Sequence, residues 1–294
     1  MWKNPNHIFR LWLVLCALRE LNLSRVIIVA WKETLIVNCM MRWVKNGQVI
    51  YINKNIKRKH FDLAKKSLLS VKSHRDFLNI KFSNHFPAYV IYDTVLKKTR
   101  DPQTKLSNKQ WFVCLAEYYH LNDQIKHIIK STKPTKIFVS HAWKTEFCTL
   151  IFNAIKNSIP VYHITGFCES LRIKKIQTLD DFKSPVDHLT YKNFLNQSYL
   201  VQKELSNLGF KELEKRQKGE INDINVSYAY GKKVSSASHP VNSTSDKKKV
   251  LVASHAWFDF PHCFGMKNFT DFLDFTIFTI CLLYTSPSPR DATL

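Results

Sequence analysis

Residues 136–143 read KIFVSHAW, and they are followed by TEFCTLIFNAIKN (145–157) and IPVYHIT (159–165). The first and third stretches are continuous apolar runs of the kind that forms buried strands, and the middle one has apolar residues at helical spacing. A strand, a helix and a strand in this order make a βαβ unit, whose two strands pair in parallel through a right-handed crossover. Strands that are apolar throughout are buried on both faces. The sequence therefore predicts an α/β protein with a doubly wound, Rossmann-like sheet.

The tetrapeptide SHAW occurs again at the end of KVLVASHAW (249–257), after a stretch rich in Ser, Thr, Gly, Lys and Asn. Each copy follows a buried-type strand, so each is expected at a strand's carboxyl end, where open α/β sheets bind their ligands. We infer a Rossmann-like domain over residues 1–230, a linker over 231–247, and the first strand and helix of a second Rossmann-like domain over 248–280.

The remaining elements are predicted from periodicity and turn signals. An apolar run at 11–18 is too short to cross a bilayer and lacks a signal-peptide cleavage site, so it is assigned to a core-facing helix. The full set comprises a helix at 9–21, a strand at 25–30, one or two helices at 62–80, a strand at 88–93, and helices at 106–131, 201–217 and 269–280.

The last fourteen residues, CLLYTSPSPRDATL (281–294), resemble the translation of sequencing-adapter read-through at the ends of metagenomic genes. They are left out of the fold prediction. We expect the second domain to be cut short here, and the start of the first domain to be missing as well. The fragment is expected to be inactive alone and poorly soluble, because its terminal aromatic residues would have no sheet to pack on.

Composition narrows the classes of function. The chain has 44 Lys and Arg against 23 Asp and Glu, a net charge of +21 that attracts nucleic acid, anionic lipid or phosphorylated substrates. Short basic clusters lie at 54–59, 211–218 and 247–249, and they fit either solvated faces or an anion-binding surface. The seven cysteines occur singly, so neither a zinc site nor a disulfide framework is indicated, and a reducing cytosol is the expected compartment.

Several enzyme classes lose support because their motifs are missing. The chain has six glycines and contains no G-x-G-x-x-G, Walker A or G-x-S-x-G sequence. Kinases, P-loop proteins, dinucleotide-dependent dehydrogenases and hydrolases with a nucleophile elbow are therefore disfavoured.

The order of elements resembles that of the GT-B glycosyltransferases, in particular those of bacterial capsule and surface-polysaccharide biosynthesis. The resemblance is carried by Tyr92-Asp93-Thr94, by Ser140-His141 ahead of the helix and strand that follow, and by 249–275 with His255, Asp259, Pro261-His262 and Asp271-Phe272. It implies an acceptor-binding N-terminal domain, a nucleotide-sugar-binding C-terminal domain, and chemistry in the cleft between them.

Two histidines are candidate catalytic residues for such a transfer, which needs a base for the acceptor hydroxyl and polar groups for the departing diphosphate. His141 suits the first role, and the alternative is a histidine that hydrogen-bonds the backbone and caps the next helix. His255 shares one loop with Asp259 and His262, and the three would contact phosphate, orient an acceptor or hold the loop. Their spacing is too loose for a metal site, so no metal is predicted.

Three further residues are candidates for substrate binding. Asp93 would bind an acceptor hydroxyl or merely end a strand. Trp143 and Trp257 would stack on a sugar or belong to the core.

The sequence thus predicts a cytoplasmic sugar transferase with no cofactor. Its partners would be a nucleotide-sugar donor, a saccharide or lipid-linked acceptor, and peripherally the anionic inner face of the membrane. Two alternatives stay open: a basic nucleic-acid-binding protein, which the charge alone favours, and a non-catalytic carbohydrate-binding or scaffold protein.

Overall fold

The computed structural model shows a mixed α/β protein made of two compact units. One unit comprises Met1–Pro185 with Ala253–Leu294, and the other Val186–Val252. The structure describes residues 5–20, 26–30, 33–43, 47–166, 171–183, 191–218, 261–264 and 268–285.

The smaller unit contributes two described helices, α9 (Tyr191–Leu195) and α10 (Tyr199–Lys218). Helix α10 agrees with the helix predicted at 201–217, and most of its described side chains are exposed. All other described elements belong to the larger unit.

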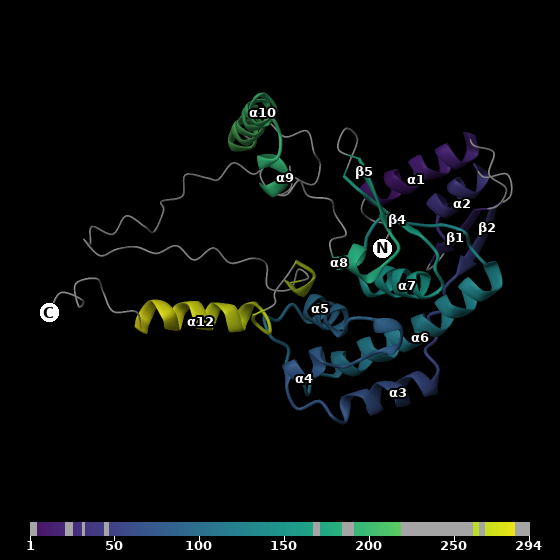
Figure 1. Ribbon diagram of the computed structural model, residues 1–294. Coiled ribbons are helices and arrows are strands. Elements are labelled where there is room, and N and C mark those ends of the chain that lie inside the picture. The colour runs from purple at the N-terminus through teal and green to yellow at the C-terminus, as the bar shows by residue number, and fades with distance from the viewer. Residues whose placement is uncertain are drawn as a thin grey trace. The chain divides into compact units, whose positions relative to one another are not determined.

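The predicted βαβ unit is confirmed (Figure 1). Strand β3 (Ile137–Val139) and strand β4 (Val161–Thr165) pair in parallel, and helix α7 (Thr145–Lys156) connects them. Strand β5 (Arg172–Ile176) joins the other side of β4 in the antiparallel direction. Its sequence, RIKKI, is mostly exposed, and antiparallel strands tolerate water on one face where parallel strands seldom do.

A second βαβ unit precedes the first. Strands β1 (Val26–Ala30) and β2 (Gly47–Tyr51) pair in parallel, and helix α2 (Leu35–Arg42) joins them. The sequence predicted β1 and missed α2 and β2. The described strands form two small sheets, one of two strands and one of three, where a single doubly wound sheet was expected.

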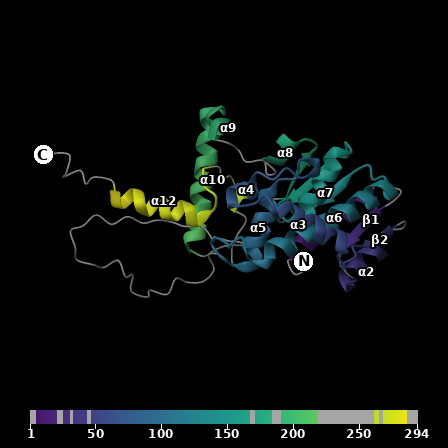
Figure 2. The same cartoon turned by 90° about the horizontal axis from the view of Figure 1, so that it is seen from below.

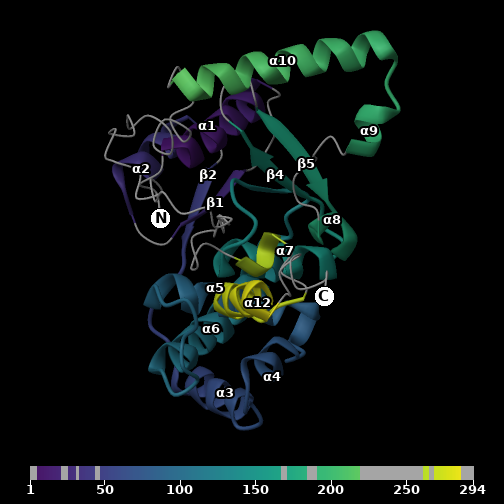
Figure 3. The ribbon, with the colours of Figure 1, turned by 90° about the vertical axis from the view of Figure 1, so that its left-hand side faces the viewer.

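Helices cover the strands on two sides, and the strands lie between α1–α2 and α6–α7 (Figures 1 and 3). Helix α1 (Pro5–Glu20), predicted at 9–21, packs on the α2 end through Trp12, whose ring centre lies 5.0 Å from that of Trp43. On the other side, Ile52 at the end of β2 packs against Leu121 and Ile125 of α6 (Lys109–Thr132).

Residues 88–93 do not form the predicted strand. They begin helix α5 (Ala88–Thr99), and the strand prediction was wrong because the window stopped at Asp93. Over the longer segment the buried residues Ala88, Ile91, Tyr92, Val95 and Leu96 recur at helical spacing, and each is at most 2% exposed.

The main core lies among the helices. Helices α3 (Arg58–Leu68) and α4 (His74–Leu78) confirm the prediction for 62–80, and α6 confirms that for 106–131. Helix α6 runs between α3 and α5 (Figure 2). Aromatic rings fill the centre: Trp111 of α6 lies 4.5 Å from Phe77 and 4.9 Å from Tyr92, measured between ring centres.

The 3₁₀ helix η3 (Pro261–Phe264) packs on α5, and helix α12 (Phe272–Thr285) follows it. Helix α12 agrees with the helix predicted at 269–280, but it extends into the first residues of the segment set aside as a tail. The predicted linker at 231–247 and strand at 249–257 lie outside the described residues. Within the described residues, no helix has both the length and the apolar character to cross a membrane.

We predict that Leu115→Ala will destabilise the protein far more than Leu69→Ala. Leu115 is fully buried in α6, whereas Leu69, at the end of α3, is 76% exposed. The buried substitution should lower the free energy of unfolding by about 2–5 kcal/mol, and the exposed one by less than about 0.5 kcal/mol. Urea denaturation of the two variants measures both values, and equal losses would contradict the assignment of the core.

Candidate functional site

The carboxyl ends of β3 and β4 are held together by an arginine from α1. The Arg10 guanidinium donates to the carbonyl of Gly166 after β4 (Nε to O, 2.7 Å) and to that of Ser140 after β3 (Nη1 to O, 3.3 Å). Gly166 has a φ of 79°, which glycine adopts without strain. The predicted strand-end loop therefore exists, and a cationic side chain lies at its base.

His141 lies at this strand end, and its ring makes a local backbone contact. Its Nδ1 accepts a hydrogen bond from the backbone N–H of Trp143 (3.1 Å). A ring that accepts through Nδ1 carries its proton on Nε2 when neutral. The neutral ring is thus arranged to donate from Nε2. The contact with the backbone of Trp143 is of the kind expected if His141 caps the following helix, which was the alternative to a catalytic role. Whether His141 acts on a substrate stays a prediction.

Trp143 lies beside His141 and is partly buried. Its ring centre is 5.5 Å from that of His141 and 5.7 Å from that of His163 on β4, edge-on to both. His163 is almost completely buried, so Trp143 packs partly on the sheet. The structure brings two of the predicted site residues together here, on a strand-end loop.

Asp93 and His262 form a second group, in which a buried carboxylate faces a buried imidazole. His262 Nδ1 lies 2.5 Å from Asp93 Oδ1, and its Nε2 lies 2.5 Å from the carbonyl oxygen of Thr270. The two side chains are 4% and 0% exposed. Because both ring nitrogens face acceptors, the arrangement suits a doubly protonated ring paired with a carboxylate.

A second carboxylate anchors α12 beside this pair. Asp271 Oδ2 accepts from the hydroxyl of Tyr92 (2.8 Å) and from the amide of Gln103 (2.6 Å). Its Oδ1 accepts from the backbone N–H of Asp274 (3.0 Å), so Asp271 also caps the first turn of α12. Tyr92 and Asp93 on α5 therefore hold η3 and α12 through two separate contacts.

Burial and charge shift the proton affinities in this cluster. Burial lowers the pKa of His262, but the hydrogen bond and the charge of Asp93 outweigh it, and the pKa ends above its ordinary value. Burial raises the pKa of the Tyr92 hydroxyl, and the carboxylate of Asp271 raises it further. At neutral pH Tyr92 is therefore a donor, and the cluster is suited to holding structure and charge in place.

The two groups are linked by a side-chain contact between residues close to them in the sequence. Thr94, next to Asp93 on α5, shares a 2.7 Å hydrogen bond between hydroxyls with Thr145, the first residue of α7. The loop that carries His141 and Trp143 leads directly into Thr145. Of the other predicted site residues, His255, Trp257 and Asp259 lie outside the described residues.

Several residues that build these groups were missed from the sequence. Arg10 lies 130 and 156 positions from its two partners, and no local pattern indicates such a contact. Asp271 had a signal, because an Asp three residues before Asp274 and ahead of an apolar run is typical of a helix start. Glu146, on the first turn of α7, was also missed, and burial raises the pKa of its carboxyl.

In the described part of the chain, no cluster of three or more His, Cys, Asp or Glu side chains is arranged to hold a metal ion. Comparison of the chain with protein-family models, curated proteins and solved structures gave no match.

We predict that Asp93→Asn will destabilise the protein in a pH-dependent way. The raised pKa of His262 means that the charged pair stabilises the fold fully below the ordinary histidine pKa, and that this stabilisation is lost as the pH rises through the raised value. The loss should be about 3 kcal/mol near pH 6 and should fall toward about 1 kcal/mol as the pH rises through the raised pKa of His262, where a neutral hydrogen bond remains.

Chemical denaturation across this pH range measures the difference between the two proteins. The matched control is Asp101→Asn, which removes an exposed carboxylate that follows the same helix. A pH-independent loss, or an equal loss in the control, would show that the pair is not charged in the folded protein.

Proposed function

We propose that this chain belongs to a sugar transferase of surface-polysaccharide assembly. It would take a sugar from a nucleotide-sugar donor and deliver it to a saccharide or lipid-linked acceptor. One observation carries the proposal: the β3–α7–β4 unit has His141 and Trp143 side by side at the carboxyl end of two parallel strands. Open α/β sheets bind ligands at that edge. The finer arrangement, two Rossmann-like domains of the GT-B kind, is part of the proposal.

The transfer itself defines what His141 must do. The acceptor oxygen bonds to the anomeric carbon, the diphosphate leaves with the electron pair of the bond that breaks, and the proton of the acceptor hydroxyl passes to water. With Nδ1 held by the Trp143 N–H, the neutral ring has its proton on Nε2. We therefore assign to His141 a hydrogen bond from Nε2 to a substrate oxygen. To act as the base, the ring would have to release Trp143 and change tautomer.

The exposure of the other candidate residues decides which of them we propose to touch a substrate. Trp143 is partly buried and offers an aromatic face to a sugar ring. Asp93 and His262 are almost fully buried, so we assign them a positioning role: they fix η3 on α5. His255, Trp257 and Asp259 keep their proposed contacts with donor or acceptor.

The basic composition fits acceptors at a membrane surface. A net charge of +21 attracts anionic headgroups and lipid-linked phosphates, and each Lys or Arg near such a surface contributes about 1 kcal/mol. We propose peripheral contact with an anionic membrane face on this ground.

The proposal is tested with His141→Asn. Asparagine keeps an acceptor near the position of Nδ1 for the Trp143 N–H but has nothing in place of Nε2. In saturation-transfer NMR with oligosaccharides and with UDP, GDP and their sugars, the variant should bind about tenfold more weakly, which is ~1.4 kcal/mol. Release of nucleoside diphosphate is followed in the same mixtures.

The matched control is His85→Asn. His85 is exposed and has a φ of 56°, a conformation that asparagine tolerates well, so this variant should bind as the unmodified chain does. Absence of saturable binding for both ligand classes, or an equal loss in the two variants, would refute the proposal.

A nucleic-acid-binding function is favoured by one observation, the net charge. It requires generic DNA or RNA to bind strongly, with an affinity that falls steeply with salt. Filter binding at low salt separates it from the sugar transferase, whose saccharide affinity should change little with salt.

A further inference from the structure

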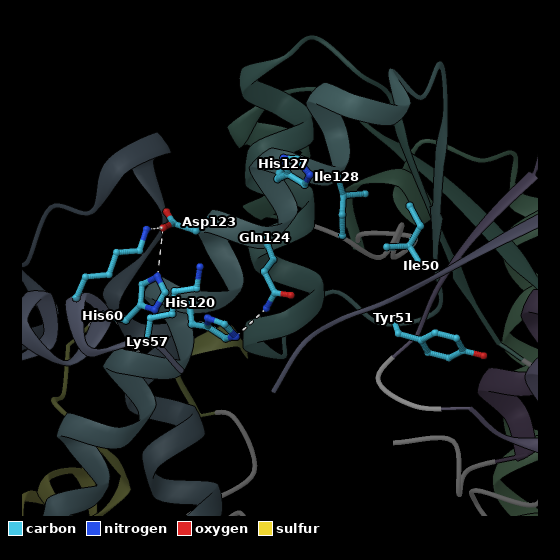
Figure 4. A pocket seen from close by; sticks show the side chains of 10 residues that line it. Ile50, Tyr51, Lys57, His60, His120, Asp123, Gln124, His127 and Ile128 are labelled. Atoms are coloured by element: carbon cyan, nitrogen blue, oxygen red, sulfur yellow. Dashed lines mark hydrogen bonds and ion pairs between the residues drawn. The ribbon is translucent and has the colours of Figure 1, made fainter. Parts of the chain in front are cut away.

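A cavity of about 300 Å³ lies at the carboxyl end of β2, on a part of the molecule that the sugar-transferase proposal does not use (Figure 4). Its wall is made by the end of β2, the start of α3 and the middle of α6. The side chains that matter for its chemistry are Tyr51, Lys57, Lys59, His60, His120 and His127. Its volume is that of a small-molecule site at the lower end of the usual range.

Two buried histidines form the inner wall. The rings of His60 and His120 meet edge to face with their centres 5.0 Å apart, and they are 1% and 7% exposed. Each ring has a partner on Nε2 only: His60 contacts Asp123 Oδ2 (3.2 Å), and His120 contacts the carbonyl oxygen of Asn53 (2.7 Å). Neither Nδ1 atom has a hydrogen-bond partner among the described residues.

Such incomplete pairing has a physical meaning. A buried polar atom without a partner costs about 1–3 kcal/mol, and native proteins retain few of them unless a water, ion or ligand completes the site. Both rings line the cavity, so this part of its wall is incompletely hydrogen-bonded.

Positive charge is concentrated at the same place. Lys57 precedes α3, and Lys59 and His60 lie in its first turn, where the helix already presents the positive end of its dipole. This first turn has no acidic residue, and the side chain of its N-cap residue, Lys57, makes no capping hydrogen bond. The carboxylate in the wall, Asp123, forms an ion pair with Lys59 (2.5 Å) and also contacts His60. Lys57 and the helix end thus add positive potential that this carboxylate does not balance.

The rest of the wall is apolar and aromatic. Ile50 and Ile128 line it, and Tyr51 at its rim is 43% exposed. An exposed aromatic ring beside an anion-attracting pocket suits a ligand with both a negative group and a ring.

We propose that this cavity is a binding site for a small soluble phosphate monoester that carries a ring, such as a nucleoside monophosphate or a sugar phosphate. The phosphate is bound by Lys57 and Lys59 at the positive end of the α3 dipole, and the ring packs on Tyr51. The site shares no residue with the strand-end loop or the Asp93–His262 pair, so it does not depend on the proposed transferase activity.

The test compares Lys57→Ala with Lys126→Ala. Both remove one exposed lysine, but Lys126 lies on α6 next to His127 and does not line the cavity. Isothermal titration with uridine monophosphate, glucose 1-phosphate and inorganic phosphate should give saturable binding to the unmodified chain. Lys57→Ala should weaken it about tenfold, and Lys126→Ala less than about twofold.

A third variant separates ring from phosphate. Tyr51→Thr keeps a residue that suits a strand but removes the ring. This variant should bind uridine monophosphate about fivefold more weakly and should bind inorganic phosphate with unchanged affinity. Ring ¹H–¹⁵N signals of His60 and His120 should move on adding each phosphate.

Three results would overturn the proposal. One is no saturable binding of any of the three compounds. Another is an equal loss in Lys57→Ala and Lys126→Ala, which would indicate attraction by net charge alone. The third is binding only to vesicles of phosphatidic acid or to an oligonucleotide. That result would show that the site binds a membrane surface or a nucleic acid and not a small soluble ligand.

Discussion

A carboxylate with no access to water, Asp93, lies on the largely buried helix α5, and the placement of the chain around it depends on how its charge is met. Leaving such a group unpaired would cost several kcal/mol, so the folded chain must supply a cation or keep the carboxyl protonated. His262 supplies it from a position 169 residues further on. The pairing fixes η3 on α5, and the Tyr92–Asp271 contact then sets the start of α12.

The sequence predicted the elements that a local residue pattern determines, and it missed the contacts that join residues far apart in the chain. The β3–α7–β4 unit follows from apolar runs on either side of a helical period, and it was predicted correctly. Residues 88–93 were misread as a strand because five of the six side chains are apolar or aromatic, and so short a run does not separate a strand from a helix. Asp93 and His262 were both chosen as site residues, but nothing in either neighbourhood indicated that they would meet. Arg10 could not be found at all, since its partners are carbonyls.

Histidine illustrates why residue type alone does not decide a role. His141 accepts a backbone hydrogen bond, His262 is held between a carboxylate and a carbonyl, and His60 and His120 each leave one nitrogen without a partner among the described residues. The same side chain is thus a local cap, half of an ion pair and part of a cavity wall. What separates the three is the number of acceptors that face the ring, a property that only the three-dimensional structure reveals.

The contact of Arg10 with the ends of β3 and β4 has a consequence for how the molecule is made. Helix α1 leaves the ribosome long before Ser140 and Gly166, and at usual synthesis rates the interval is on the order of ten seconds or more. Throughout that time the Arg10 guanidinium lacks both of its carbonyl acceptors, so this contact closes only after β4 has been made.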